Sequence, residues 1–228
     1  ESQSIYWASL SLDSPHEQLQ INSHRMIRVA LKDSFKRGKL LHYSSDSNEV
    51  LDWTNNLAVI PTIINRYTAI LTRRDELGNT VTGFLNGYRN FLIDATIALS
   101  QNGQKNQAQK TYRILQKEWP DAPQFKKTLT QFVEQEFLSD ILSYNPDQAS
   151  STIHAFLMKS YFFAITDQVE LFNNSLRQAK LIHQRYNKFR ESTGQSTKSR
   201  LSLPPFEQMQ QKAKEQFFLL APEGKGKF

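Results

Sequence analysis

The chain has 228 residues, of which 39% are hydrophobic and 22% charged; this balance is typical of a folded globular protein with one substantial domain and excludes wholesale disorder. It has no cysteine, which excludes disulfides, thiolate metal sites and cysteine nucleophiles. No run of about 18 apolar residues occurs, so no membrane-spanning helix is predicted, and because the first residue is Glu1 we expect a processed or truncated form of unknown compartment.

The N-terminal segment predicts a short lead-in followed by a long helix. Residues 1–15 form the lead-in, in which only the stretch from Ile5 to Leu12 resembles the alternation of a strand. Apolar side chains at spacings of three and four then predict a helix over 16–37. Gly38 follows directly and is a suitable C-terminal stop.

A polar stretch and a proline-containing helix come next. Residues 42–52 are rich in serine, asparagine and aspartate and predict a loop. Apolar residues recur with helical spacing within 53–71, where Pro61 interrupts the pattern. Either the helix begins near Asn56, with Pro61 close to its first turn, or it is kinked at Pro61.

The rest of the chain continues the helical pattern. Helical periodicity predicts six further helices, at about 81–101, 105–118, 124–143, 149–166, 167–191 and 206–219. With only 8 glycines and 8 prolines to interrupt these runs, we expect an all-α fold of about eight helices stacked as antiparallel hairpins. The predicted organisation is a helical domain over 1–191, a linker over 192–205, and a C-terminal helix and tail over 206–228.

One hairpin, residues 89–122, has small and large residues at positions that allow close helix packing. Two alanines are small where the helices must approach, a tyrosine fills the space beside them, a glycine marks the turn, and a proline ends the second helix. These packing positions are Leu92, Ala95, Leu99, Gly103, Ala108, Tyr112 and Pro120.

Residues 89–122 resemble one tetratricopeptide repeat, a 34-residue helical hairpin. Thr96 and Leu115 depart from the small residues of that family, and residues 156–189 resemble a second repeat only loosely. The resemblance implies an architecture of stacked hairpins and a role in protein contacts. It carries no ligand-binding residues to this chain.

The net charge of +6 is concentrated in residues 177–200, because the rest of the chain is neutral. Glu191 is the only acidic residue of this segment, whose basic residues are Arg177, Lys180, Arg185, Lys188, Arg190, Lys198 and Arg200. A basic helix face beside a basic linker could bind an acidic protein, nucleic-acid phosphates or anionic lipid. The alternative is a solvated face whose cations favour a helix C-terminus.

A second basic stripe lies on the helix predicted over 16–37. Its members, which share one face away from the apolar positions, are Arg25, Arg28, Lys32 and Lys36. The same two interpretations apply, although Asp33 and Glu17 make the local field less one-sided.

No catalytic apparatus is visible in the sequence. The five histidines are scattered without metal-ligand spacing, and neither a glycine-rich phosphate loop nor a nucleophile motif occurs. We therefore expect no catalytic residues, metal, cofactor or small-molecule substrate. The leading hypothesis is a non-enzymatic protein interaction or scaffold module, part of a larger assembly; the alternative is an anion-binding module that uses residues 177–200 for nucleic acid or an anionic membrane surface.

Overall fold

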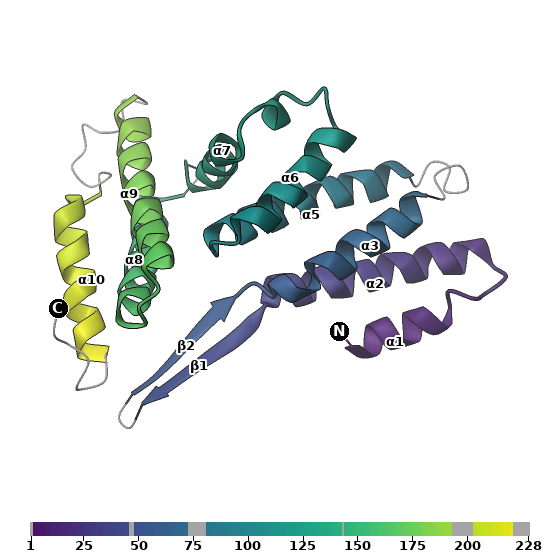
Figure 1. Ribbon diagram of the computed structural model, residues 1–228, viewed down its shortest axis with the longest axis horizontal. Helices are drawn as coiled ribbons and strands as arrows, with labels where there is room; N and C mark the ends of the chain where they lie inside the picture. The colour runs from purple at the N-terminus through teal and green to yellow at the C-terminus, as the bar shows by residue number, and fades with distance from the viewer. Residues whose placement is uncertain (1, 46–47, 73–80, 143, 193–202, 221–228) are drawn as a thin grey trace. The chain divides into compact units, whose positions relative to one another are not determined.

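The computed structural model describes residues 2–45, 48–72, 81–142, 144–192 and 203–220. Within these ranges the chain forms nine α-helices, two short 3-10 helices and one two-stranded hairpin, which confirms the predicted all-α class (Figure 1). The chain divides into two compact units. The first comprises Glu1–Tyr43, Val50–Leu99 and Gln107–Pro120; the second comprises Ser44–Glu49, Ser100–Asn106 and Asp121–Phe228. This division cuts through the domain expected over 1–191 and groups the C-terminal helix with the second unit.

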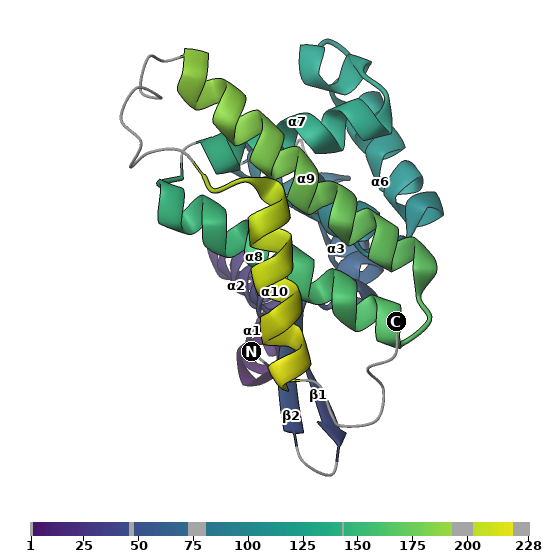
Figure 2. The same cartoon turned by 90° about the vertical axis from the view of Figure 1, so that its left-hand side faces the viewer.

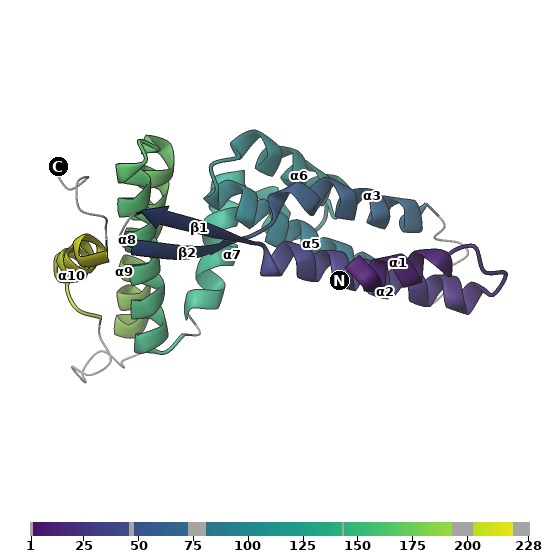
Figure 3. The ribbon, with the colours of Figure 1, turned by 90° about the horizontal axis from the view of Figure 1, so that it is seen from below.

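The helices of the first unit follow the predicted order. They are α1 (Ser2–Leu10), α2 (Glu17–Arg37), α3 (Ile60–Leu71), α5 (Val81–Gln101) and α6 (Lys105–Glu118), with the 3-10 helix η1 (Leu57–Val59) before α3. Helix α1 lies against α2 (Figure 3). The strand-like alternation from Ile5 to Leu12 is therefore misleading, since most of that stretch is helical.

Local chemistry explains two of these boundaries. Helix α2 ends where Gly38 takes a φ of 67° and its backbone N–H bonds the carbonyl of Ser34, a conformation that glycine adopts without steric cost. Pro61 lies in the first turn of α3, where its missing N–H removes no intrahelical hydrogen bond. The structure thus favours the unkinked alternative.

Aromatic side chains from α2, α3 and α5 meet in the core of the first unit. The ring of Tyr67 stacks on that of Tyr88 at 4.8 Å between centroids, and Phe35 contacts Phe91 edge-on at 5.6 Å. All four are nearly inaccessible to water. Such pairs add to the hydrophobic free energy of burial and orient the helices that carry them.

Helices α5 and α6 carry the positions that the sequence pattern singled out for packing. The positions Leu92, Ala95, Leu99, Ala108 and Tyr112 are all at most 1% exposed. Gly103 takes a φ of 74° at the turn, and α6 ends at Glu118, two residues before Pro120. Thr96, which departs from the repeat pattern, is also buried, and its hydroxyl donates a hydrogen bond to the Leu92 carbonyl at 2.7 Å.

The prediction of a loop at 42–52 is wrong. Strands β1 (Lys39–Ser45) and β2 (Asn48–Thr54) form a two-stranded sheet across this region. The apolar and aromatic residues of the two strands have high strand propensity. Two such runs on either side of a short polar stretch of sequence are typical of a hairpin, a signal that the polar composition of the stretch obscured.

The second unit is a layered helical array. It contains η3 (Pro123–Lys126), α7 (Leu129–Leu142), α8 (Pro146–Ile165), α9 (Val169–Ser192) and α10 (Phe206–Leu220). Helices α8 and α9 form the central hairpin, with α7 on one side and α10 on the other (Figures 1 and 2). Asp167 makes the tight turn of this hairpin with a φ of 56°, which aspartate tolerates better than most residues.

Helix α10 is held by an apolar stripe. Phe206, Met209, Ala213 and Phe217 recur at helical spacing and are buried with Leu203 before them. The hydroxyl of Tyr161 on α8 donates to the Gln210 carbonyl at 3.1 Å, so a polar bond supplements the apolar contact. Helix α10 is thus an integral layer of the second unit.

Candidate interaction surfaces

An exposed apolar surface covers parts of α1 and α2. Six large hydrophobic side chains, each between 48% and 64% exposed, define this apolar α1–α2 surface: Tyr6, Trp7, Leu10, Leu19, Met26 and Val29. Helix α2 also buries Ile27 and Ala30, and Ala30 is one turn from the exposed Met26 on the same side of the helix. The apolar residues of α2 therefore extend over a broad arc of the helix, and part of this arc remains exposed. Sequence reasoning missed this because it assigned the apolar residues of the helix to a single side.

The stripe on α2 that was predicted to be basic and exposed is largely engaged with α5. The guanidinium of Arg28 lies over the Phe84 ring at 4.9 Å and over the Tyr67 ring at 5.6 Å, and that of Arg25 lies 5.9 Å from Phe84. Lys36 forms an ion pair with Asp94 at 3.6 Å. Lys32 is half-buried, so the four residues offer no row of unengaged cations.

The buried phenols beside Arg28 are held in their neutral form. Burial raises the pKa of Tyr67 from 10.0 to about 12, although the nearby charge and hydrogen bond of Arg28 act in the opposite direction. Burial also raises the pKa of Tyr88, against a hydrogen bond with Thr68. The Arg28–Tyr67 contact is therefore a packing and hydrogen-bonding arrangement around a neutral ring.

The basic side chains of α9 form the second surface. Arg177, Lys180, Arg185 and Lys188 are all exposed, whereas Ala179, Ile182 and Tyr186 on the opposite side are fully buried. The predicted division of this helix into a basic and an apolar face is correct. We call these four residues the α9 basic row. Lys198 and Arg200 lie outside the described residues.

Arg190 is placed differently from the other basic residues of α9. Its Nη2 donates to the Tyr144 carbonyl and to the Tyr186 hydroxyl, both at 2.9 Å, and its guanidinium lies over the Tyr186 ring at 5.0 Å. The Tyr186 hydroxyl also donates to the Tyr144 carbonyl at 3.2 Å. Arg190 thus joins the end of α9 to the segment before α8, and we leave it out of the candidate surface.

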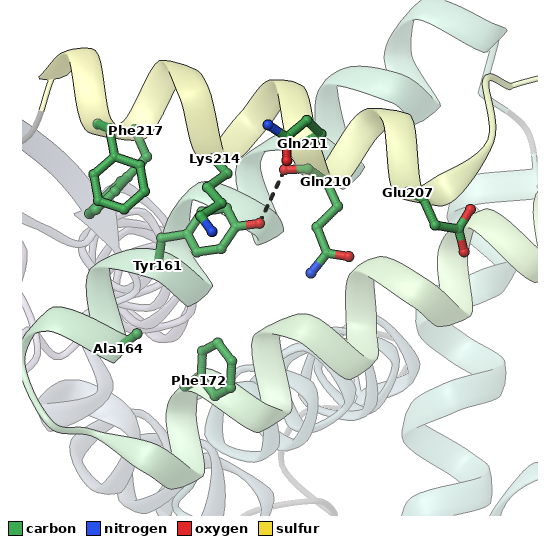
Figure 4. Close-up of a pocket in the computed structure, with 9 residues that line it drawn as sticks. Tyr161, Ala164, Phe172, Glu207, Gln210, Gln211, Lys214 and Phe217 are labelled. Atoms are coloured by element: carbon green, nitrogen blue, oxygen red, sulfur yellow. Dashed lines mark hydrogen bonds between the residues drawn. The ribbon is translucent and has the colours of Figure 1, made fainter. Parts of the chain in front are cut away.

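A pocket of about 400 Å³ opens between the α8–α9 hairpin and α10 (Figure 4). Its lining mixes aromatic and polar residues, with the rings of Tyr161, Phe172 and Phe217 around the space and Glu207 and Lys214 on α10. The volume falls within the usual range for small-molecule sites. The residues that line the pocket include no histidine or serine, and the Tyr161 hydroxyl is already bonded to the Gln210 carbonyl.

His183 and His154 make contacts that hold helices together. His183 places Nε2 at 2.7 Å from the Pro204 carbonyl and its ring against Phe206, and His154 bonds Gln216. Both therefore join α10 and the residues before it to the hairpin. In the parts of the chain that the structure describes, no three histidine or acidic side chains gather as a metal site. Nor does any described helix combine the length and apolar character needed to cross a bilayer.

No protein-family model matches the chain, and neither a curated protein nor a solved structure matches it. What the described residues define is a predominantly helical protein with two kinds of candidate surface, one apolar and one basic. The functional proposals below rest on these surfaces.

Proposed function

We propose that this chain is a non-enzymatic protein interaction module that binds its partner through the apolar α1–α2 surface. The single observation that carries the proposal is the exposure of six large hydrophobic side chains on two adjacent helices. Scattered apolar residues are normal on a protein surface, but a concentration of them marks a contact site. Aromatic residues and methionine are also enriched at such contacts.

The composition of the surface suits a protein partner. Trp7 and Tyr6 present large, rigid rings that contact each other edge-on at 5.2 Å, and tryptophan and tyrosine dominate the binding energy of many interfaces. Leu19, Met26 and Val29 extend the surface along one face of α2. The resemblance of residues 89–122 to a tetratricopeptide repeat supports the same kind of role, because that hairpin serves protein contacts.

Site-specific photo-cross-linking tests the proposal. A photoreactive phenylalanine analogue at Tyr6 or Met26, introduced into the full-length protein in its native cells, is expected to give one stoichiometric protein adduct. The same analogue at Val169 or Leu219, which are exposed apolar positions of the second unit, is expected to give none. Sedimentation velocity of the purified chain then distinguishes a second copy from a different partner.

Paired variants provide the control. Trp7→Ser combined with Met26→Ser is expected to abolish the adduct, whereas Val169→Ser combined with Leu219→Ser removes comparable exposed apolar side chains elsewhere and is expected to leave it unchanged. A lack of any adduct from positions 6 and 26, or equal yields from all four positions, would contradict the proposal.

A further inference from the structure

We propose that the α9 basic row binds the phosphate backbone of double-stranded nucleic acid without reading its sequence. This surface belongs to the second unit and is independent of the apolar α1–α2 surface. Its cations are Arg177, Lys180, Arg185 and Lys188, all exposed on α9, where they spread over about 140° of the helix circumference.

The row is not explained by the stability of α9. Favourable interaction of cations with a helix C-terminus is confined to the last turn, and in α9 the basic residue of that turn is Arg190, which makes its own packing contacts. Among the residues that the structure describes, none of the four forms an ion pair with an acid; Arg177 contacts only the Asn174 amide oxygen, at 3.4 Å.

The arrangement of the charges even opposes helix formation. Arg177 and Lys180 are three residues apart, as are Arg185 and Lys188, so each pair brings like charges together on the helix surface. Within the described residues 177–192, Glu191 is the one acidic residue of the sequence, and it follows the last member of the row by three residues. A polyanion that lies along the helix would remove this repulsion.

The spacing fits a regular row of phosphates. The segment from Arg177 to Lys188 extends about 16 Å along the helix axis at 1.5 Å per residue. Phosphates follow one another by about 3.4 Å along the axis of each duplex strand, so the row faces roughly five of them. The exposed amide of Gln184 lies between the cations and can donate to a phosphate oxygen.

The residues absent from this segment decide between anionic partners. Single-stranded nucleic acid requires aromatic rings on which bases stack, but Tyr186, the aromatic residue of the segment, is fully buried. A membrane surface requires apolar side chains that insert beside the cations. The exposed large hydrophobic residues described in the second unit, Val169, Phe218 and Leu219, lie outside residues 177–188. Duplex nucleic acid needs neither.

Fluorescence anisotropy with a labelled 20-base-pair DNA of arbitrary sequence tests the proposal on the full chain. Binding is expected at 50 mM NaCl, and four phosphate contacts imply a slope of log K against log salt of about −3.6, so that 200 mM NaCl weakens binding roughly 100-fold. A second duplex of unrelated sequence should bind within about threefold of the first, because backbone contacts carry no sequence information.

Matched charge reversals locate the site. Arg185→Glu with Lys188→Glu is expected to weaken binding at least tenfold at 50 mM NaCl and to reduce the slope by about half. Arg66→Glu with Lys126→Glu changes the net charge equally at exposed positions of α3 and η3, and should change affinity less than threefold. Circular dichroism checks that both variants fold. Trp7→Ser with Met26→Ser should leave duplex binding unchanged, which separates this proposal from the preceding one.

Four results would overturn it: no duplex binding at 50 mM NaCl, equal losses in the two reversal variants, tighter binding to a single strand or to phosphatidylserine vesicles than to the duplex, or tighter binding to polyglutamate. The last three would point respectively to a general charge effect, to another anionic surface, and to an acidic protein partner.

Discussion

The guanidinium carbon of Arg28 lies 4.9 Å from the centre of the Phe84 ring. The arginine stands on α2 and the phenylalanine on α5, so this contact joins two helices of the first unit. A residue that the sequence places on a basic, solvated stripe is therefore part of the packing between helices. The contact also explains why the space around Gly87 is tight, since Arg28 Nη1 lies close to it.

Replacement of Arg28 by alanine is expected to lower the free energy of unfolding by about 1–2 kcal/mol, because it removes a half-buried cation from two aromatic rings. Urea denaturation followed by circular dichroism measures the loss. Arg66→Ala, at an exposed position of α3, is the control and should change stability by less than about 0.5 kcal/mol. Equal effects of the two changes would contradict the role given to Arg28.

Two glycines on α5 form a matched pair of test positions. A Cβ at Gly83 meets no atom within 4 Å, so Gly83→Ala should stabilise the protein by about 1 kcal/mol through helix propensity. A Cβ at Gly87 would lie 3.0 Å from the Tyr67 hydroxyl and 3.1 Å from Arg28 Nη1. We expect the free energy of unfolding of the Gly87→Ala variant to be at least about 1 kcal/mol lower than that of the Gly83→Ala variant. Thermal or urea unfolding of both variants provides the comparison. Equal stabilities would contradict this prediction and show that the Arg28 and Tyr67 side chains move aside at little cost.

The Tyr67 phenol predicts a pH dependence at high pH. Its pKa is raised from 10.0 to about 12 in the folded protein, so the folded state holds the proton more tightly than the unfolded state does. The resulting stabilisation is fully present below pH 10 and is lost as the pH rises from about 10 to 12. Tyr67→Phe should flatten the decline in stability over this interval. Unfolding measured between pH 8 and 11.5 tests this, and an unchanged decline would assign it to other groups.

Arg190 and Arg185 should differ although both are arginines near the end of α9. Arg190→Ala removes two hydrogen bonds to Tyr144 and Tyr186 and should cost about 1–3 kcal/mol of stability. Arg185→Ala, at an exposed position, should cost less than about 0.5 kcal/mol. Chemical denaturation distinguishes them. Similar losses in both variants would mean that the bonds of Arg190 contribute no more than surface charge.

The elements of the chain follow largely from local sequence. The spacing of apolar residues and the helix-terminating or helix-starting residues Gly38 and Pro61 located the helices, because these signals act within one or two turns of the backbone. The hairpin of β1 and β2 was missed for the same reason. The polar residues between the two strands favour a loop locally, whereas pairing of the strands depends on residues on both sides of that polar stretch.

The charged surfaces show where local reasoning stops. On α9 the helical period separates the exposed cations from the buried Ala179 and Ile182, although the half-buried Leu181 lies one turn from both Arg177 and Arg185. On α2 the same period placed Arg28 with the solvated residues, since it cannot reveal that the Phe84 and Tyr67 rings of two other helices lie over it.

The sequence by itself determined the helical class, most helix positions and the division of α9 into a basic and an apolar face, since each depends on spacing along one element. Only the tertiary structure decided which cations remain unengaged, that Arg190 bonds the segment before α8, and that the apolar residues Trp7 and Met26 stay exposed. These outcomes depend on which surfaces of distant elements contact each other, because a side chain is buried by its neighbours on other elements and not by its own helix alone.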